Sequence, residues 1–310
     1  MRHLLFSTVI LLIFSGACST ARKAGLQETD ELARSLLWKI EDKTLGEPSY
    51  LLGTIHLIPD EMYFWTEEME YAFQQSDQIA MELDMEDTNP TALMGLMGSL
   101  LLPDGKSIGD FVSAEQYEEI RAYFEKTGLP FMLLEKIKPY FLYLFISLDI
   151  DNLDQESVKS YEMEITEKAR SEGKPAVGLE SIEFQISLFD SIPYDYQADM
   201  LVQAIEQKQN PAGEMNESEA LFQAYVDQDI SLLYKESSEE GDEIMQKFSH
   251  LLIDKRNRSW IPVIAELVRQ KPTLIAVGAG HLGGPNGVIR LLQNEGFTIT
   301  PIMMQTDGTD

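Results

Sequence analysis

Short apolar runs alternate with amphipathic stretches along most of this chain. Two of the runs, 36–40 and 50–53, flank a turn-rich gap containing Gly46 and Pro48, which predicts a β-hairpin. Mostly apolar runs bounded by polar or turn residues predict further strands at 78–83, 176–179, 273–277 and 297–303. Apolar residues at helical spacing predict helices between them at 65–75, 182–189, 196–207, 217–227 and 286–294.

The middle of the chain has a mostly helical period and lacks a strand pattern. Helices are predicted there at 91–102, 114–126, 140–148 and 158–172. A longer helix is predicted at 242–270, kinked or broken at Pro262. Strands that alternate with helices predict an α/β fold with a mixed central sheet, and residues 90–173 are interpreted as a helical insertion that caps it.

The first residues are typical of an export signal. Arg2 precedes an apolar run at 4–14, and three small residues then lead directly to Cys18. This order resembles a bacterial lipoprotein signal, although Ser15 stands where leucine is usual, and an ordinary secretory signal is the alternative. We therefore predict a signal peptide at 1–17, a lipidated Cys18 with a tether at 18–35, and one domain at 36–310.

These boundaries carry an expectation about location. We expect a domain that faces the periplasm or is anchored in the cell envelope. No later run reaches the 18 apolar residues that indicate a membrane-spanning helix, so membrane contact is expected only through the anchor.

The charge balance excludes some partners. The chain has 52 Asp and Glu residues against 24 Lys and Arg, a formal net charge of −28. Nucleic acids carry the same sign of charge and are therefore excluded as main partners. Metal cations, peptides and other small substrates remain as candidate ligands. Because Cys18 is the only cysteine, the folded body has neither a disulfide nor a cysteine nucleophile.

One pattern occurs twice in the chain. A predicted strand is followed by Gly-x-x-His-Leu and then a proline, first from Gly53 to His56 and again from Gly278 to His281. Side chains just past the carboxyl ends of strands line the ligand crevice of open α/β sheets. A mixed sheet built from two such strand–Gly-x-x-His–helix–strand units would therefore bring His56 and His281 to one site.

Carboxylates at strand ends are the candidate third metal ligands. A catalytic metal usually has three protein ligands and one open position. Glu82 ends the predicted strand at 78–83, and Glu180 directly follows the strand at 176–179. An acid in these positions is costly to bury unless it is paired or coordinated. Asp84 competes for the role, since it would point to the same side of the strand as Glu82.

Three other features of the sequence have more than one interpretation. Arg256 belongs to a charged cluster at 254–258 that is either a solvated helix face or a cation for an oxyanion or substrate carboxylate. His250 lacks the repeated context, which favours a packing or surface role. Residues 278–283 also match G-x-G-x-x-G, but the strand that follows ends without the acid of a dinucleotide fingerprint.

Taken together, these residues resemble the TraB/GumN family, to which the animal Tiki proteins are similar. The resemblance runs from about Leu36 to Ile302 and is strongest around His281. It implies a mixed α/β domain and, through Tiki, a divalent-metal-dependent peptidase supported by manganese or cobalt. It assigns His56 and His281 to the family's two Gly-x-x-His histidines. Glu82 and Glu180 correspond to the acids after inner strands, and Arg256 to the basic residue of an Arg-Asn pair.

The leading hypothesis is an exported metallohydrolase, most specifically a peptidase. His56, His281 and either Glu82 or Glu180 would bind manganese, cobalt or zinc, and the other glutamate would act as general base. Arg256 would stabilise an oxyanion, and the insertion would form a lid. The first alternative is an exported lipoprotein that binds heme or another ligand without catalysis, like the distantly similar ChaN-like proteins. The second is a metal-free hydrolase that uses His56 with Glu82.

Overall fold

The computed structural model describes residues 32–44, 46–83, 96–128, 130–147, 158–209, 217–238 and 243–305. The predictions for the signal peptide, Cys18 and most of the tether lie outside these residues. So do Asp84 and the first residues of the predicted insertion, as far as residue 95.

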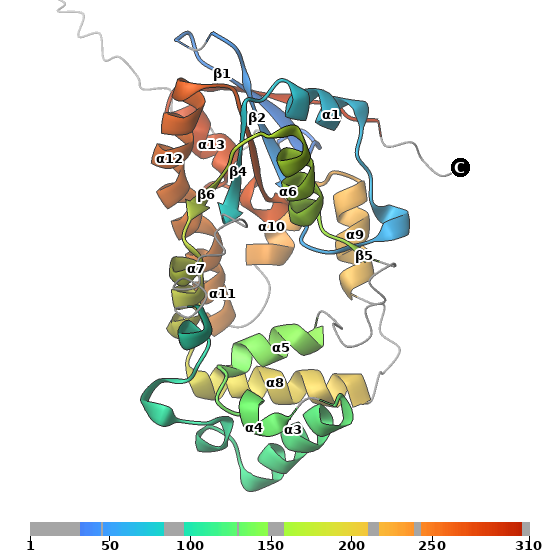
Figure 1. Ribbon diagram of the computed structural model, residues 1–310, viewed down its shortest axis with the longest axis vertical. Helices are drawn as coiled ribbons and strands as arrows, with labels where there is room; N and C mark the ends of the chain where they lie inside the picture. Colours follow the sequence, from blue (N-terminus) through green and yellow to red (C-terminus); the bar gives the residue numbers. More distant parts are fainter. Residues whose placement is uncertain are drawn as a thin grey trace, which may run out of the picture. The chain divides into compact units, whose positions relative to one another are not determined.

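A six-stranded sheet forms the centre of the fold (Figure 1). Its order is β6-β4-β7-β2-β1-β8. The bounds are β1 (Leu37–Glu41), β2 (Ser49–Thr54), β4 (Gln78–Leu83), β6 (Ala176–Glu180), β7 (Thr273–Gly278) and β8 (Thr298–Ile302). Neighbours from β6 to β2 are parallel, whereas β1 is antiparallel to both β2 and β8. The predicted α/β fold with a mixed sheet and the predicted hairpin, now β1 and β2, are confirmed.

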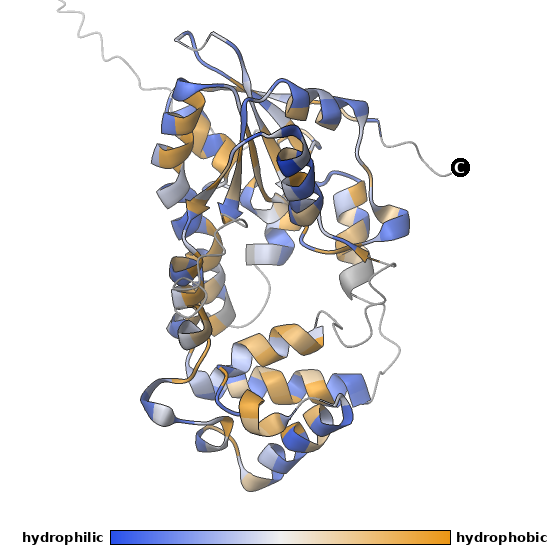
Figure 2. Ribbon diagram, in the orientation of Figure 1, coloured by the Kyte–Doolittle hydropathy of each residue, from blue (hydrophilic) through white to orange (hydrophobic). Residues whose placement is uncertain are grey.

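The central strands have continuous apolar sequences because helices cover the sheet on both faces. Strands β4 and β7 are buried over nearly their whole length. They share one core with apolar residues of α1 (Glu67–Gln74), α6 (Tyr161–Glu172), α12 (Arg256–Gln270) and α13 (Val288–Asn294). In Figure 2 the strands have hydrophobic colours, whereas α6 is largely hydrophilic toward the viewer. The helices thus enclose the sheet with their apolar sides.

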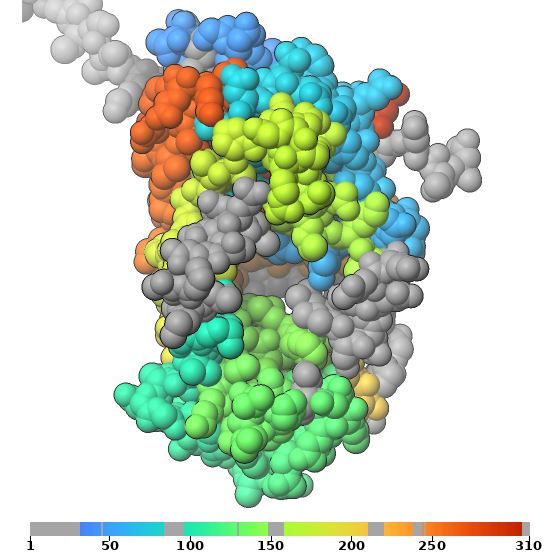
Figure 3. Space-filling view, in the orientation of Figure 1, coloured from blue at the N-terminus to red at the C-terminus, as the bar shows by residue number. Residues whose placement is uncertain are grey.

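Helices alone form a second apolar core. It joins α3 (Ala114–Lys126), α4 (Phe131–Leu134), α5 (Pro139–Ser147) and α8 (Tyr194–Gln209) around Phe124 and Leu201. Figure 3 shows α3 and α5 in green and α6 in yellow-green as separate areas of the visible face. The helical core thus draws on α8, beyond the expected range 90–173, whereas α6 within that range packs against the sheet. No helix of the described residues is long and apolar enough to cross a bilayer.

The long predicted helix is interrupted at another place than expected. Helix α11 (Glu243–His250) leads into a π-helix, Leu251–Lys255, and then into α12. Helix α12 continues through Pro262, so of the two predicted outcomes, a kink or a break at this proline, the break is wrong. The buried neighbours Trp260, Ile261 and Ile264 fix this part of the helix in the core, and such packing outweighs one lost hydrogen bond. The π-helix, a feature frequent at functional sites, directly precedes Arg256.

The remaining strands and α-helices are short. They are the two-residue strands β3 (Ile58–Pro59) and β5 (Val158–Lys159), with the helices α7 (Ile182–Leu188), α9 (Glu217–Val226) and α10 (Ile230–Ser238). Strands β3 and β5 pair antiparallel, with Ile58 opposite Lys159. The sequence predicted neither this small ribbon nor α10.

Candidate functional site

The carboxyl ends of four neighbouring strands carry the predicted site residues in order. Glu180 ends β6, and Glu82 lies near the end of β4. His281 follows β7, and His56 follows β2. Since β6, β4, β7 and β2 are consecutive and parallel, these ends meet along one edge of the sheet. The repeated Gly-x-x-His pattern thus lies on adjacent strands, with Thr54 opposite Gly278.

Arg256 connects the two glutamates. Its Nε donates to Glu180 Oε1 at 2.8 Å, and its Nη2 donates to Glu82 Oε2 at 2.5 Å. The side chain of Arg256 is only 5% exposed and those of Glu82 and Glu180 are 10% and 4% exposed, so this is a buried ion cluster. Burial opposes the charge of Arg256, but both carboxylates outweigh it and raise the pKa of the guanidinium.

Glu180 is committed to holding Arg256 in place. Its Oε1 also lies 2.7 Å from Nη2 of Arg256, and its Oε2 accepts from Trp260 Nε1 at 2.9 Å. Burial raises the pKa of Glu180 despite these donors. Glu180 is not among the residues that line the pocket described below. Its contacts make it a positioning group for Arg256.

The hydrogen bonds around His281 fix its tautomer. Asn257 Nδ2 donates to two backbone carbonyls, those of His281 and Asn286, at 3.2 and 2.9 Å. Its Oδ1 therefore faces His281 Nδ1, 2.6 Å away, so that Nδ1 carries the proton. The other ring nitrogen, Nε2, is left as an acceptor. It lies 3.2 Å from Nη1 of Arg256 and 3.7 Å from Glu82 Oε1.

Charge states in this cluster follow from burial and from Arg256. Burial lowers the pKa of His281 to about 3, which makes the imidazole neutral at pH 7. Burial also works to raise the pKa of Glu82, but His281, which is protonated in strong acid, and Arg256 outweigh it and lower that pKa to about 2. At neutral pH, Arg256 supplies the positive charge, and the N–H of Gly278 donates to Glu82 Oε1 at 2.8 Å. Glu82 is therefore ionised beside an unprotonated Nε2.

His56 has its own carboxylate partner, which sequence reasoning missed. Its Nδ1 lies 3.1 Å from Oε1 of Glu162, in the first turn of α6. The same oxygen accepts from Thr54 Oγ1 at 2.8 Å, and Glu162 Oε2 accepts from Ser160 Oγ at 3.1 Å. The ribbon of β3 and β5 brings the start of α6 to His56, because β3 begins two residues after this histidine.

The pair of His56 and Glu162 has a predictable titration. The hydrogen bond to Glu162 raises the pKa of His56 from 6.5 to about 9, although the imidazole is 73% exposed and solvent screens the pair. Because the folded-state pKa is the higher one, the pair stabilises the fold fully below pH 6.5. That contribution is lost as the pH rises through about 9.

We expect Glu162→Gln to move the pKa of His56 back toward 6.5, because a neutral amide removes the charge that favours the imidazolium. An NMR titration of the His56 ring protons measures this shift. Glu164→Gln is the matched control, because Glu164 lies exposed in the same helix. An unchanged His56 pKa in Glu162→Gln, or an equal fall in both variants, would contradict the assigned pairing.

A pocket of about 240 Å³ lies at this edge of the sheet. His56, Glu82, Arg256 and His281 all line it, together with residues of α9, α10 and the π-helix. Both Gly-x-x-His histidines and one strand-end glutamate thus line one cavity.

The glycines after β7 serve close packing with α10. A Cβ atom added at Gly280 would lie 2.5 Å from Ser237 Oγ, and one at Gly283 would lie 2.6 Å from the carbonyl oxygen of Ile230. Helix α10 thus covers the side of the loop where a dinucleotide fingerprint would receive a pyrophosphate. The match to G-x-G-x-x-G therefore has a packing explanation.

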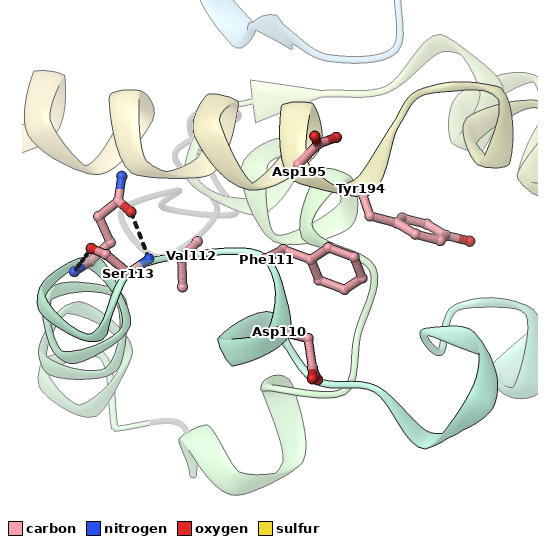
Figure 4. A pocket seen from close by; sticks show the side chains of 7 residues that line it. Asp110, Phe111, Val112, Ser113, Tyr194 and Asp195 are labelled. Carbon is pink, nitrogen blue, oxygen red and sulfur yellow. Dashed lines mark hydrogen bonds between the residues drawn. The ribbon is translucent and has the colours of Figure 1, made fainter.

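Two other features lie outside this pocket. A pocket of about 460 Å³ lies at the surface, between the Asp110–Gln116 segment and the first turn of α8 (Figure 4). Phe111 and Tyr194 lie there with ring centroids 5.5 Å apart, and no histidine lines the pocket. His250 pairs with Asp254 through its Nδ1 at 2.7 Å and is not among the residues of either pocket.

The donor chemistry at the sheet edge suits a divalent cation. A metal-binding histidine usually donates its second ring N–H to an oxygen acceptor. Both His56 and His281 have such a partner at Nδ1, and Glu82 is an ionised oxygen donor. An ion at Nε2 of His56 would replace the proton that this imidazole holds at pH 7, and an ion at Nε2 of His281 would replace the contact with Nη1 of Arg256. Within the part of the chain that the structure describes, no three such groups converge into a preformed cluster. The evidence that a divalent cation fits this site is therefore the type of the three donor groups, two imidazoles and one carboxylate.

Fold and site together define an α/β protein with a pocket of histidines and a buried glutamate–arginine cluster at the carboxyl edge of a parallel sheet. The chain belongs to the TraB/PrgY/gumN family, whose model matches residues 36–301 of the 310. The family resemblance drawn from the two histidine motifs is thereby confirmed.

Distant relatives carry the name of a protease. The chain is 24% identical to the metalloprotease TIKI1 of Danio rerio, over 86% of this chain and 62% of the relative. It is 25% identical to TIKI1 of Xenopus tropicalis, over 88% of this chain and 63% of the relative. The chain is 24% identical to TIKI1 of Homo sapiens, over 92% of this chain and 65% of the relative. The chain thus spans less than two thirds of these relatives, and no solved structure matches it significantly.

Proposed function

We propose that this protein is a divalent-metal-dependent hydrolase that cleaves peptides. The observation that carries the proposal is the pairing of ionised Glu82 with the unprotonated Nε2 of His281, 3.7 Å apart in a pocket that also contains His56. The TIKI relatives are named metalloproteases, which supports the same chemistry.

His56, His281 and Glu82 would hold the ion. When bound, the ion would act as a Lewis acid and lower the pKa of a water molecule, which makes a nucleophile at neutral pH. Asn257 holds the proton on Nδ1 of His281, and Glu162 orients His56 in the same way. These contacts fix the orientation of each ring, with Nε2 on the side opposite the partner of Nδ1.

Arg256 and Glu180 would work as a pair. Glu180 binds two nitrogens of Arg256 and fixes the guanidinium beside Glu82. Arg256 lines the pocket, so its positive charge is available to a substrate carbonyl oxygen as negative charge develops there. Of the two candidate glutamates, we therefore assign Glu82 to the metal and Glu180 to Arg256.

Cleavage of a fluorogenic peptide library tests the proposal. We expect hydrolysis after loading with manganese, cobalt or zinc, and loss of hydrolysis with a chelator, because the ion supplies the nucleophile. Glu82→Gln should be inactive, and His250→Ala, which leaves the pocket unchanged, should retain activity.

Two outcomes would favour the alternatives. Hydrolysis that survives the chelator but is lost in Glu82→Gln would indicate a metal-free mechanism with His56 and Glu82. Absence of hydrolysis, with a Soret band on heme titration that His56→Ala or His281→Ala removes, would indicate a binding protein.

A further inference from the structure

The walls of the pocket differ sharply in chemistry. The sheet-edge wall carries His56, Glu82 and Arg256, whereas the wall from α9, α10 and the π-helix is largely aliphatic. Its side chains are Leu221, Tyr225, Leu233, Ser237, Leu252 and Ile253. A substrate bound across the pocket thus meets the charged groups on one side and aliphatic surface on the other.

The polar side chains on or beside the aliphatic wall have already used their donors. Tyr225 donates its hydroxyl to the carbonyl of Gly53 at 3.0 Å, and Ser237 donates to the carbonyl of Leu233 at 2.7 Å. Thr54 donates to Glu162 at 2.8 Å. Among the described residues of this wall, no hydroxyl proton is left for a substrate. A polar group placed here would lose its water without gaining a donor in return.

We propose that this wall is a subsite for an apolar side chain of the substrate peptide, next to the bond that the sheet-edge groups attack. The subsite rests on the proposed function, since it names the kind of peptide that the same pocket takes. The whole pocket, which the subsite shares with the sheet-edge groups, measures about 240 Å³, and an apolar cavity of about 150 Å³ already binds benzene, so the pocket has space for an apolar side chain.

Binding of blocked amino acids tests the subsite without any hydrolysis. The probes are N-acetyl-leucinamide and N-acetyl-phenylalaninamide, with N-acetyl-lysinamide and N-acetyl-aspartamide as charged comparisons. Their dissociation constants are measured by NMR titration of the metal-free protein. We expect the apolar amides to bind about tenfold more tightly than the charged ones, since removing an apolar group from water is favourable and burying an unpaired charge is not.

Matched variants locate the binding. Leu221→Gln and Leu252→Gln replace half-buried leucines of the wall on two different elements. Each should weaken binding of the apolar amides by about tenfold. Leu232→Gln is the control, because Leu232 lies in α10 but is 38% exposed and does not line the pocket. Thermal unfolding verifies that each variant is folded.

Two results would overturn the subsite: equal binding of apolar and charged amides, or tight apolar binding that persists in both pocket variants. Failure of the proposed function is recognised separately. If apolar amides bind at the wall but the protein cleaves no peptide, the subsite is supported and the proposed hydrolase function is contradicted. If the protein cleaves peptides without preference for apolar residues and binds all the amides equally, the hydrolase function is supported and the subsite is contradicted.

Discussion

Replacing Arg256 with methionine is expected to lower the free energy of unfolding by about 3–5 kcal/mol, because it leaves buried carboxylates without their cation. Glu82 and Glu180 both lie at hydrogen-bond distance from this guanidinium and are at most 10% exposed. The side chain also stacks on Trp260, with Cζ 4.7 Å from the ring centroid. Urea unfolding at pH 7 measures the change.

The matched control is Arg258→Met in the same helix. Arg258 is exposed, and its Nη2 donates to Asn286 Oδ1 at 2.8 Å, so its loss should cost no more than about 1 kcal/mol. If Arg256→Met destabilises no more than this control, the buried ion cluster does not exist as described. Adding Glu82→Gln to Arg256→Met should recover part of the lost stability, because a neutral amide costs less to bury than a charge.

The cluster also predicts an acid transition in the wild type. Because the pKa of Glu82 is lowered from 4.5 to about 2 in the folded state, its contribution to stability is present above pH 4.5. That contribution is lost as the pH falls toward 2. In Arg256→Met, this part of the pH dependence should be reduced, since the cation that favours the carboxylate is missing.

The second large effect concerns His281. We expect His281→Ala to weaken binding of manganese, cobalt or zinc by more than about 100-fold, because even an outer partner of a metal ligand is typically worth 10–100-fold. Asn257→Leu should weaken binding by about 10–100-fold, since Asn257 fixes the proton on Nδ1 of His281. Calorimetric titration with each metal measures both effects.

His250→Ala serves as the control for this series. His250 has a carboxylate partner in Asp254, but it is outside the pocket. Metal affinity should therefore stay at the wild-type value. Equal losses in His250→Ala and His281→Ala would mean that the protein binds these ions at its acidic surface rather than at the sheet edge.

The sheet edge was predictable because its signals are local. Each apolar strand and its terminal Gly-x-x-His or glutamate are continuous in the sequence, and parallel strands place their carboxyl ends together. His56, Glu82 and His281 therefore needed no knowledge of long-range contacts to be proposed for one site. Arg256 followed from the family resemblance, and its distances show that it binds the two glutamates directly.

Glu162 was not predictable in the same way. It reaches His56 only through the pairing of β3 with β5, and each of these strands has two residues, too few to give a period. Its local signal was modest: Ser160 caps a helix that begins one residue before the glutamate. Nothing in that cap indicates a partner 106 residues away.

Helix α10 was missed although its signal was present. Ile230, Leu233, Tyr234 and Ser237 have the i, i+3, i+4, i+7 spacing of one helix face. The residues from Glu236 onward are largely acidic, which weakens the apolar pattern toward the end of the helix. Residues 230–238 form a helix that packs closely against the glycines after β7, where a Cβ atom would collide with α10.

The most direct test of the account is the metal content of the purified protein after loading with manganese, cobalt or zinc, measured by elemental mass spectrometry beside Glu82→Gln. The account predicts close to one ion per chain in the wild type and none in the variant, because Glu82 is the ionised oxygen donor next to Nε2 of His281. An ion retained in full by Glu82→Gln, or no ion in the wild type under any loading, would contradict it.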